Sequence, residues 1–127
     1  MEVKMPNVFK DEYQNYDNLL TEATVKYTTG TETLQKGNKL KRGAVLGYIS
    51  GTDKVTLVNK GATDTSKSVY CILATDIDAT DKDMVVPVYY SGGFNTRNLT
   101  FGGNDTYKDH KLSARLVSIF FNSIPRG

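Results

Sequence analysis

The chain has 127 residues, of which 39% are hydrophobic, and its 16 basic and 14 acidic residues give a net charge of +2. A chain of this length is expected to form one domain, and it can bury a core without disulfides or a structural metal. Charge alternates along the chain: three basic and five acidic residues in 1–30, seven and two in 35–67, and one and four in 76–83. This pattern suits a surface that meets copies of itself or a patterned partner better than a nucleic-acid-binding face.

Residues 1–18 are predicted to form an extended N-terminal arm, and residues 19–127 the folded domain. A segment this polar buries too little surface to order by itself. Two interpretations of the arm stay open: a flexible terminus, or a segment that orders on a partner by adding a strand to a sheet edge. The second is suggested by six apolar or aromatic residues, the candidate binding residues of the chain: Val3, Met5, Val8, Phe9, Tyr13 and Tyr16.

The start of the chain lacks the apolar run of a signal peptide. The longest apolar stretch, residues 84–90, is much shorter than a membrane span. The sequence therefore predicts no membrane partner. We expect the protein to be made in a cytoplasm and to leave it only as part of a larger particle.

From residue 23 onward the sequence is typical of β-structure. Short runs of β-branched and aromatic residues bounded by Gly or Asn predict strands, at 24–28, 31–35, 45–49 and 55–58. Residues 51–54 are expected to form a tight connection, and residues 60–67 a polar loop.

The two most apolar runs, residues 69–74 and 84–90, should be the most buried strands. The single cysteine, Cys71, lies in the first of them and is predicted to be a small buried hydrophobe. Pro87 lacks an amide proton, which places its strand at an edge or a bulge. Gly92-Gly93 should turn the chain out of the second strand.

One short helix is predicted near the C-terminus. Thr106 and Asp109 have the spacing of a capping box, and Leu112 and Leu116 form an apolar stripe that should face the core. Residues 117–121 then form a closing strand. Regular strands with one helix predict a mainly β, barrel-like domain.

Neither a metal site nor catalytic residues are predicted. The aspartates of residues 76–83 do not fit an EF-hand, because Thr80 and Asp81 occupy its fifth and sixth positions and Pro87 its twelfth. A less regular cation site remains an alternative, but a solvated crossing between two strands explains these aspartates more simply. His110 is the only histidine, and its neighbour Asp109 is poorly placed for a relay on a helix. We therefore expect no enzyme, no cofactor and no small-molecule substrate.

The densest basic cluster gives little support for nucleic-acid binding. It consists of Lys36, Lys39, Lys41 and Arg42, with Tyr48 as the only nearby aromatic platform. The favoured interpretation is that these cations are solvated turn residues around a buried Leu40.

Five segments follow one another along the chain in a characteristic order: Asp17-Asn-Leu-Leu20, Leu40–Ile49, Ile72–Thr80, Pro87–Asn95 and Leu112–Phe121. In this order they resemble the bacteriophage head decoration protein family, the lambda-type protein D class. The chain departs from the family pattern at Val117-Ser-Ile-Phe120, where the family often has Arg-Gly-Ile-Phe. Its loop at 60–67 also lacks the usual small residues.

The resemblance implies a β-tulip domain that forms a homotrimer and binds the major capsid protein on the outside of an expanded icosahedral head. The trimers would occupy threefold and quasi-threefold positions, reach the shell with their arms, stabilise it, and leave the packaged DNA untouched. Two alternatives remain: a tail or baseplate β-domain of a virion, and a small nucleic-acid-binding β-barrel.

Overall fold

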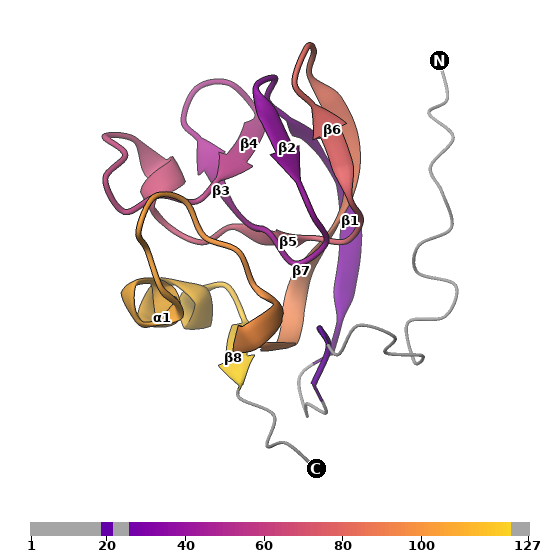
Figure 1. The fold of residues 1–127 in the computed structure, drawn as a ribbon. Coiled ribbons are helices and arrows are strands. Elements are labelled where there is room, and N and C mark those ends of the chain that lie inside the picture. Colours follow the sequence, from indigo (N-terminus) through magenta and orange to yellow (C-terminus); the bar gives the residue numbers. More distant parts are fainter. Residues whose placement is uncertain (1–18, 22–25, 123–127) are drawn as a thin grey trace.

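The computed structural model describes residues 19–21 and 26–122 (Figure 1). The elements in chain order are β1 (Thr28–Leu34), β2 (Asn38–Leu40), β3 (Val45–Ile49), β4 (Lys54–Leu57), η1 (Thr65–Lys67), β5 (Cys71–Leu73), β6 (Ile77–Ala79), β7 (Met84–Asn95), η2 (Thr96–Asn98), α1 (Tyr107–Leu116) and β8 (Ile119–Asn122). Within the described residues, no helix is long and apolar enough to cross a membrane.

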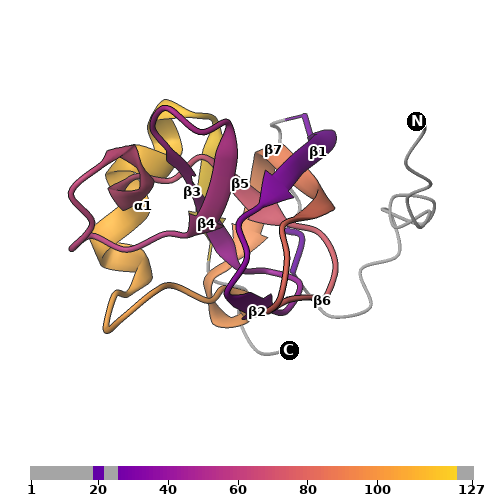
Figure 2. The ribbon, with the colours of Figure 1, turned by 90° about the horizontal axis from the view of Figure 1, so that it is seen from above.

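Six strands form one sheet in the order β1-β4-β3-β5-β7-β8, and β1 also pairs with β7. This second pairing closes β1, β4, β3, β5 and β7 into a small barrel. Strands β2 and β6 form a separate antiparallel pair, and α1 lies on the side of the domain opposite β1 (Figure 2). The predicted mainly β, barrel-like fold with one short C-terminal helix is confirmed.

Strand β7 runs through the whole domain. Its first part pairs with β1 and β5, and its last four residues pair in parallel with β8. Gly92 was expected to turn the chain out but continues this strand, with a φ of 136°. A Cβ at Gly92 would lie 2.2 Å from the ring of Tyr27, so glycine permits this close approach.

Pro87 lies inside β7 and not at a bulge. It pairs with Thr31 of β1, and its carbonyl accepts a hydrogen bond of 3.0 Å from the N–H of Ala74, just past the end of β5. The prediction that Pro87 places its strand at an edge or a bulge was therefore wrong, because β7 pairs with β1 and β5 on its two sides. The carbonyl of Ala74 accepts the guanidinium of Arg42 at 3.0 Å, so it does not need an amide proton from residue 87.

Two cores pack against the two faces of the barrel wall. Inside the barrel lie apolar side chains from all five of its strands, among them Leu34, Leu46, Val55, Leu73 and Val88. Cys71 belongs to this interior and is fully buried, as predicted. Burial, followed by the nearby negative charge of Glu32, raises the pKa of its thiol well above the ordinary value, so the thiol stays protonated and inert.

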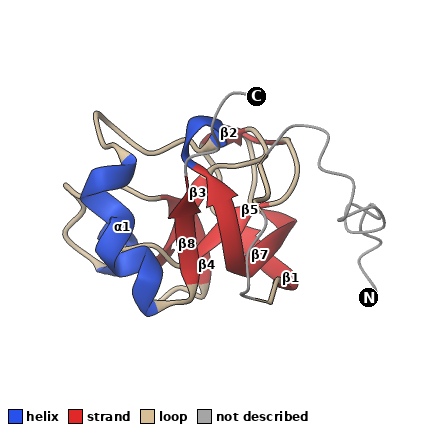
Figure 3. Ribbon diagram, turned by 90° about the horizontal axis from the view of Figure 1, so that it is seen from below, coloured by secondary structure: helices blue, strands red, loops and turns tan. Residues whose placement is uncertain are grey.

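The second core includes side chains from the outer face of the barrel, from α1 and from Leu19, Leu20 and Tyr27. Figure 3 shows α1 beside the strands of the barrel. Its fully buried side chains are Leu19, Val45, Val58, Ile72, Tyr89, Phe94, Ala114 and Ile119. Ile72 and Tyr89 are paired neighbours on β5 and β7. The segments 69–74 and 84–90, predicted as the most buried strands, therefore separate the two cores.

Two predictions about strand limits were wrong. Gly30 was expected to end a strand, but β1 runs through it. The ring of Tyr90 lies against the strand at this point, and a Cβ on residue 30 would come within 2.4 Å of that ring, so glycine permits the contact. Residues 76–83 were predicted to be a solvated crossing. Their four aspartates are exposed, as predicted, but the segment also contains β6, which pairs with β2 and buries Ala79 completely.

The helix was predicted in the right place but with the wrong face buried. The capping box of Thr106 and Asp109 is present. However, Leu112 and Leu116 are 74% and 82% exposed, and the buried residues are His110 and Ala114. The same i, i+4 spacing thus fits two faces of one helix, and polar contacts of His110, described below, select the face that is buried.

This orientation of the helix predicts unequal effects of truncation. We expect Leu112→Ala and Leu116→Ala to change the free energy of unfolding of the isolated subunit by no more than about 0.5 kcal/mol, because both side chains are in solvent there. Ile119→Ala, which leaves a cavity in the outer core, should lower it by about 2–5 kcal/mol. Urea denaturation measures all three, and comparable losses at the three positions would contradict the orientation.

Candidate binding surfaces

Leu19–Thr21, which we call the root of the predicted N-terminal arm, are joined to β7. The carbonyl of Leu19 accepts the N–H of Asn95 at 2.7 Å, and the N–H of Thr21 donates to the carbonyl of Gly93 at 3.0 Å. Leu20 forms an antiparallel bridge with Phe94. Leu19 and Leu20 are 0% and 7% exposed, so backbone pairing and burial together fix this segment to the central strand.

The C-terminal end of the described domain lies beside Leu19–Thr21. The side-chain amide of Asn122, the last described residue, donates to the hydroxyl of Thr21 at 2.9 Å. Tyr27 reinforces the root, because its hydroxyl donates to the carbonyls of Thr21 and Gly93. The chain therefore enters and leaves the described domain at one end (Figure 1). The six predicted arm residues, from Val3 to Tyr16, lie outside the described residues.

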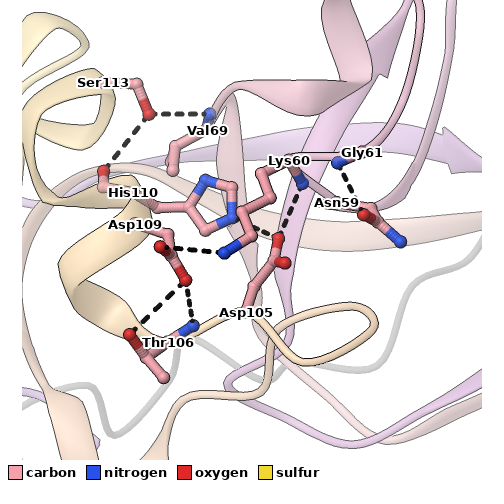
Figure 4. A network of polar contacts seen from close by, with 9 residues as sticks. All are labelled: Asn59, Lys60, Gly61, Val69, Asp105, Thr106, Asp109, His110 and Ser113. Atoms are coloured by element: carbon pink, nitrogen blue, oxygen red, sulfur yellow. Dashed lines mark hydrogen bonds and ion pairs between the residues drawn. The ribbon is translucent and has the colours of Figure 1, made fainter.

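A buried polar network joins α1 to the loops beside it (Figure 4). The side chains of His110 and Asp105 are each 2% exposed, and His110 Nε2 lies 2.7 Å from Asp105 Oδ2. The same carboxylate oxygen accepts the backbone N–H of Lys60 at 2.6 Å. The ring of Phe101 stacks on the imidazole, with 5.4 Å between centroids and 4° between planes.

Asp105 is ionised near neutral pH. Burial opposes ionisation, but hydrogen bonds from His110 and from the Lys60 backbone outweigh it and lower the pKa of this carboxyl below its ordinary value. Because Asp105 is then an acceptor only, His110 Nε2 carries the proton and donates. Asp109, predicted to be poorly placed for a relay with His110, binds Lys60 Nζ at 3.2 Å and the Thr106 N–H at 2.8 Å.

A serine stands near this pair but does not complete a catalytic relay. The hydroxyl of Ser113 donates to the backbone carbonyl of His110 at 3.2 Å and accepts the N–H of Val69 at 3.3 Å. A nucleophilic serine would need its hydroxyl on the imidazole itself. These contacts tie α1 to the segment before β5, and the network holds the helix in place.

The aspartates of residues 76–83 act separately. Asp76 accepts the N–H of Arg42 at 2.9 Å, Asp78 accepts the N–H of Thr80 at 3.0 Å, and Asp83 binds Lys54 Nζ at 2.8 Å. Among residues 19–21 and 26–122, no three His, Cys, Asp or Glu side chains gather closely enough to hold a metal ion.

The basic cluster divides in two. Lys36, Lys39 and Lys41 are exposed, as predicted for solvated turn residues. Arg42 is not solvated in this way: its guanidinium donates to the carbonyl of Ala74 at 3.0 Å and to the hydroxyl of Tyr89 at 3.1 Å. That cation therefore supports the fold.

Comparison with known proteins adds one finding. A family model described as bacteriophage lambda head decoration protein D matches residues 8–118. The matched region includes part of the predicted arm, the whole barrel and α1. No curated protein matches the chain.

The buried pair predicts a pH-dependent contribution to stability. Because the folded-state pKa of Asp105 is lowered, its contribution is complete above the ordinary carboxyl pKa, near 4, and is lost as the pH falls through the folded value. Asp105→Asn should therefore flatten the fall in stability below about pH 4. Urea midpoints of the wild type and the variant between pH 2.5 and 6 measure this difference, and parallel curves would contradict it.

Removal of the Asp105 carboxylate should also destabilise the fold at neutral pH. We expect Asp105→Ala to lower the free energy of unfolding by about 3 kcal/mol, because it leaves His110 buried without its acceptor. Asp81→Ala is the matched control, since Asp81 is exposed, and it should change the free energy by less than about 0.5 kcal/mol. Equal effects of the two variants in urea unfolding would show that the pair does not stabilise the helix.

Proposed function

This chain belongs to the bacteriophage lambda head decoration protein D family, and we propose that it binds as a homotrimer to the outside of an expanded icosahedral phage head. The trimers occupy threefold and quasi-threefold positions, contact the major capsid protein, and stabilise the shell. Family membership already makes the chain a structural component of a phage virion, in a family not known for enzymes. The match across most of the chain is the observation that carries the proposal.

The root of the arm supports a mechanical role. A force applied to residues 1–18 passes into Leu19–Thr21, and from there into β7 through two backbone hydrogen bonds and a buried leucine pair. Strand β7 in turn pairs with β1, β5 and β8. A pull on the arm is thus distributed over the barrel instead of peeling off an isolated edge.

Three arms on one trimer would bind far more tightly than one. Once the first arm is attached, the others bind at a high effective concentration, and the gain in overall affinity is about 10²–10⁴-fold. In this proposal the apolar residues of the arm make the contact with the shell, namely Val3, Met5, Val8, Phe9, Tyr13 and Tyr16. Each trimer then bridges several capsid subunits, which resists the outward pressure of packaged DNA without touching it.

Deletion of residues 1–15 tests the arm. The deletion leaves Leu19–Thr21 in place, so we expect a folded trimer with unchanged thermal stability. Its binding to purified expanded heads that lack the protein should be weaker by about 100-fold or more, because every arm is lost together. Cosedimentation with heads over a concentration series measures the affinity.

A second variant separates arm chemistry from arm length. Val3, Met5, Val8 and Phe9 all changed to Ser keep the length and charge of the arm, and should reproduce most of the deletion's loss. Binding of both variants as tight as that of the wild type would refute the arm contact. Failure of the wild type to bind heads at all would refute the decoration role itself.

A further inference from the structure

The outer face of α1 is an apolar surface with no partner in the described structure. Leu112 and Leu116 lie one turn apart and are the two most exposed large hydrophobic residues described. Three exposed cations surround them, Lys108, Lys111 and Arg115, and none of the three forms an ion pair within the described part of the chain. We call these five residues the helix face.

A second surface, acidic and aromatic where the helix face is basic and aliphatic, lies on the barrel. Tyr48, Tyr70 and Tyr90 group around Glu32, with ring centroids 5.1 Å apart for Tyr48–Tyr70 and 6.0 Å apart for Tyr70–Tyr90. All four residues are partly exposed, and we call them the tyrosine cluster. Tyr48 is two residues after Leu46 on β3, and Tyr90 is two residues after Val88 on β7. Because alternate side chains of a strand share a face, both tyrosines lie on the face that points into the barrel.

The carboxylate of Glu32 has room for a cation. Its Oε2 accepts hydrogen bonds from the hydroxyls of Tyr90 and Tyr70, whereas Oε1 has no hydrogen bond among the described residues. No buried side-chain oxygen in that part of the chain lacks a partner, so Oε1 is open to solvent. No described lysine or arginine forms an ion pair with Glu32.

The phenols cannot add charge of their own to this site near neutral pH. Burial and then the negative charge of Glu32 raise the pKa of Tyr70 to about 12, and burial and the hydrogen bond to Glu32 raise that of Tyr90 further still. Both hydroxyls stay donors, and their rings offer faces to a cation. A second carboxylate, Asp53, accepts the hydroxyl of Tyr48 at 3.3 Å and extends the acidic surface.

We propose that the helix face of one copy of this chain docks on the tyrosine cluster of the next copy, with a helix cation on Glu32 and the two leucines against the tyrosine rings. The inference deepens the proposed function, on which its trimeric form rests, by naming the surfaces through which copies join. The two surfaces are complementary in charge, and tyrosine and arginine are the residues that most often dominate such contacts. Contact between two helix faces is disfavoured, because it would oppose three cations to three cations.

An interface between two different surfaces is heterologous, so each copy uses one surface to hold its neighbour and offers the other to the next copy. Such a contact closes into a ring or continues as a filament. A closed ring of three matches the proposed trimer, with every helix face and every tyrosine cluster covered. This arrangement explains why the leucines of α1 point away from their own core.

Two double variants test the proposal. Lys111→Glu with Leu116→Ser disrupts the helix face at exposed positions, where folding is unaffected. Glu32→Gln with Asp53→Asn removes both carboxylates from the tyrosine cluster with little change in shape. Lys82→Glu with Val85→Ser is the matched control, because it makes the same types of change at exposed positions of another surface. Sedimentation velocity of the full chain up to about 1 mM measures association, and circular dichroism verifies folding.

We expect the wild type and the control to form trimers, and each of the other two variants to associate at least about tenfold more weakly. Mixed in equal amounts, these two variants retain one intact interface between them and should form dimers but no trimers. A helix-face variant that trimerises like the wild type would overturn the inference, as would a wild type that stays monomeric at every concentration. Binding of the same preparations to heads is scored separately, so a monomer that still decorates heads would refute this interface but not the decoration role.

Discussion

The structure depends on β7, because this strand, together with β5, separates the two cores. In the part of β7 that forms the barrel wall, neighbouring residues face opposite sides, so that Val88 packs inside the barrel and Tyr89 packs outside it. The same strand holds β1 and β5 at one end and Leu20 and β8 at the other. A shift of one residue in its register would exchange the two cores, and the arm root would lose its hydrogen bonds as well.

The position of α1 follows from this arrangement and from the buried polar network. Asp105 holds the imidazole of His110, and Ser113 binds the backbone before β5. Both contacts fix the rotation of the helix about its axis, and that rotation directs Leu112 and Leu116 into solvent. A stabilising contact within the domain thus determines which surface is available to a partner.

The sequence predicted the mainly β fold, the buried strands and the capping box, since these depend on local spacing and apolar content. It could not predict the strand pair β2–β6, whose alternation is too short to recognise among charged residues. Nor could it select the buried face of α1: the leucines form the better apolar stripe, and only tertiary contacts of His110 with Asp105 reverse the choice. The contacts of Tyr70 and Tyr90 with Glu32 likewise require β1, β7 and the residue before β5, which are distant in sequence, to be placed side by side.

Cryo-electron microscopy of expanded heads, imaged with and without added protein, tests the central claim most directly. The account predicts added density from three copies of the barrel at each threefold and quasi-threefold position, with the Leu19 end of every domain facing the shell. Heads that gain no density at these positions, or protein found on tails and not on heads, would contradict it.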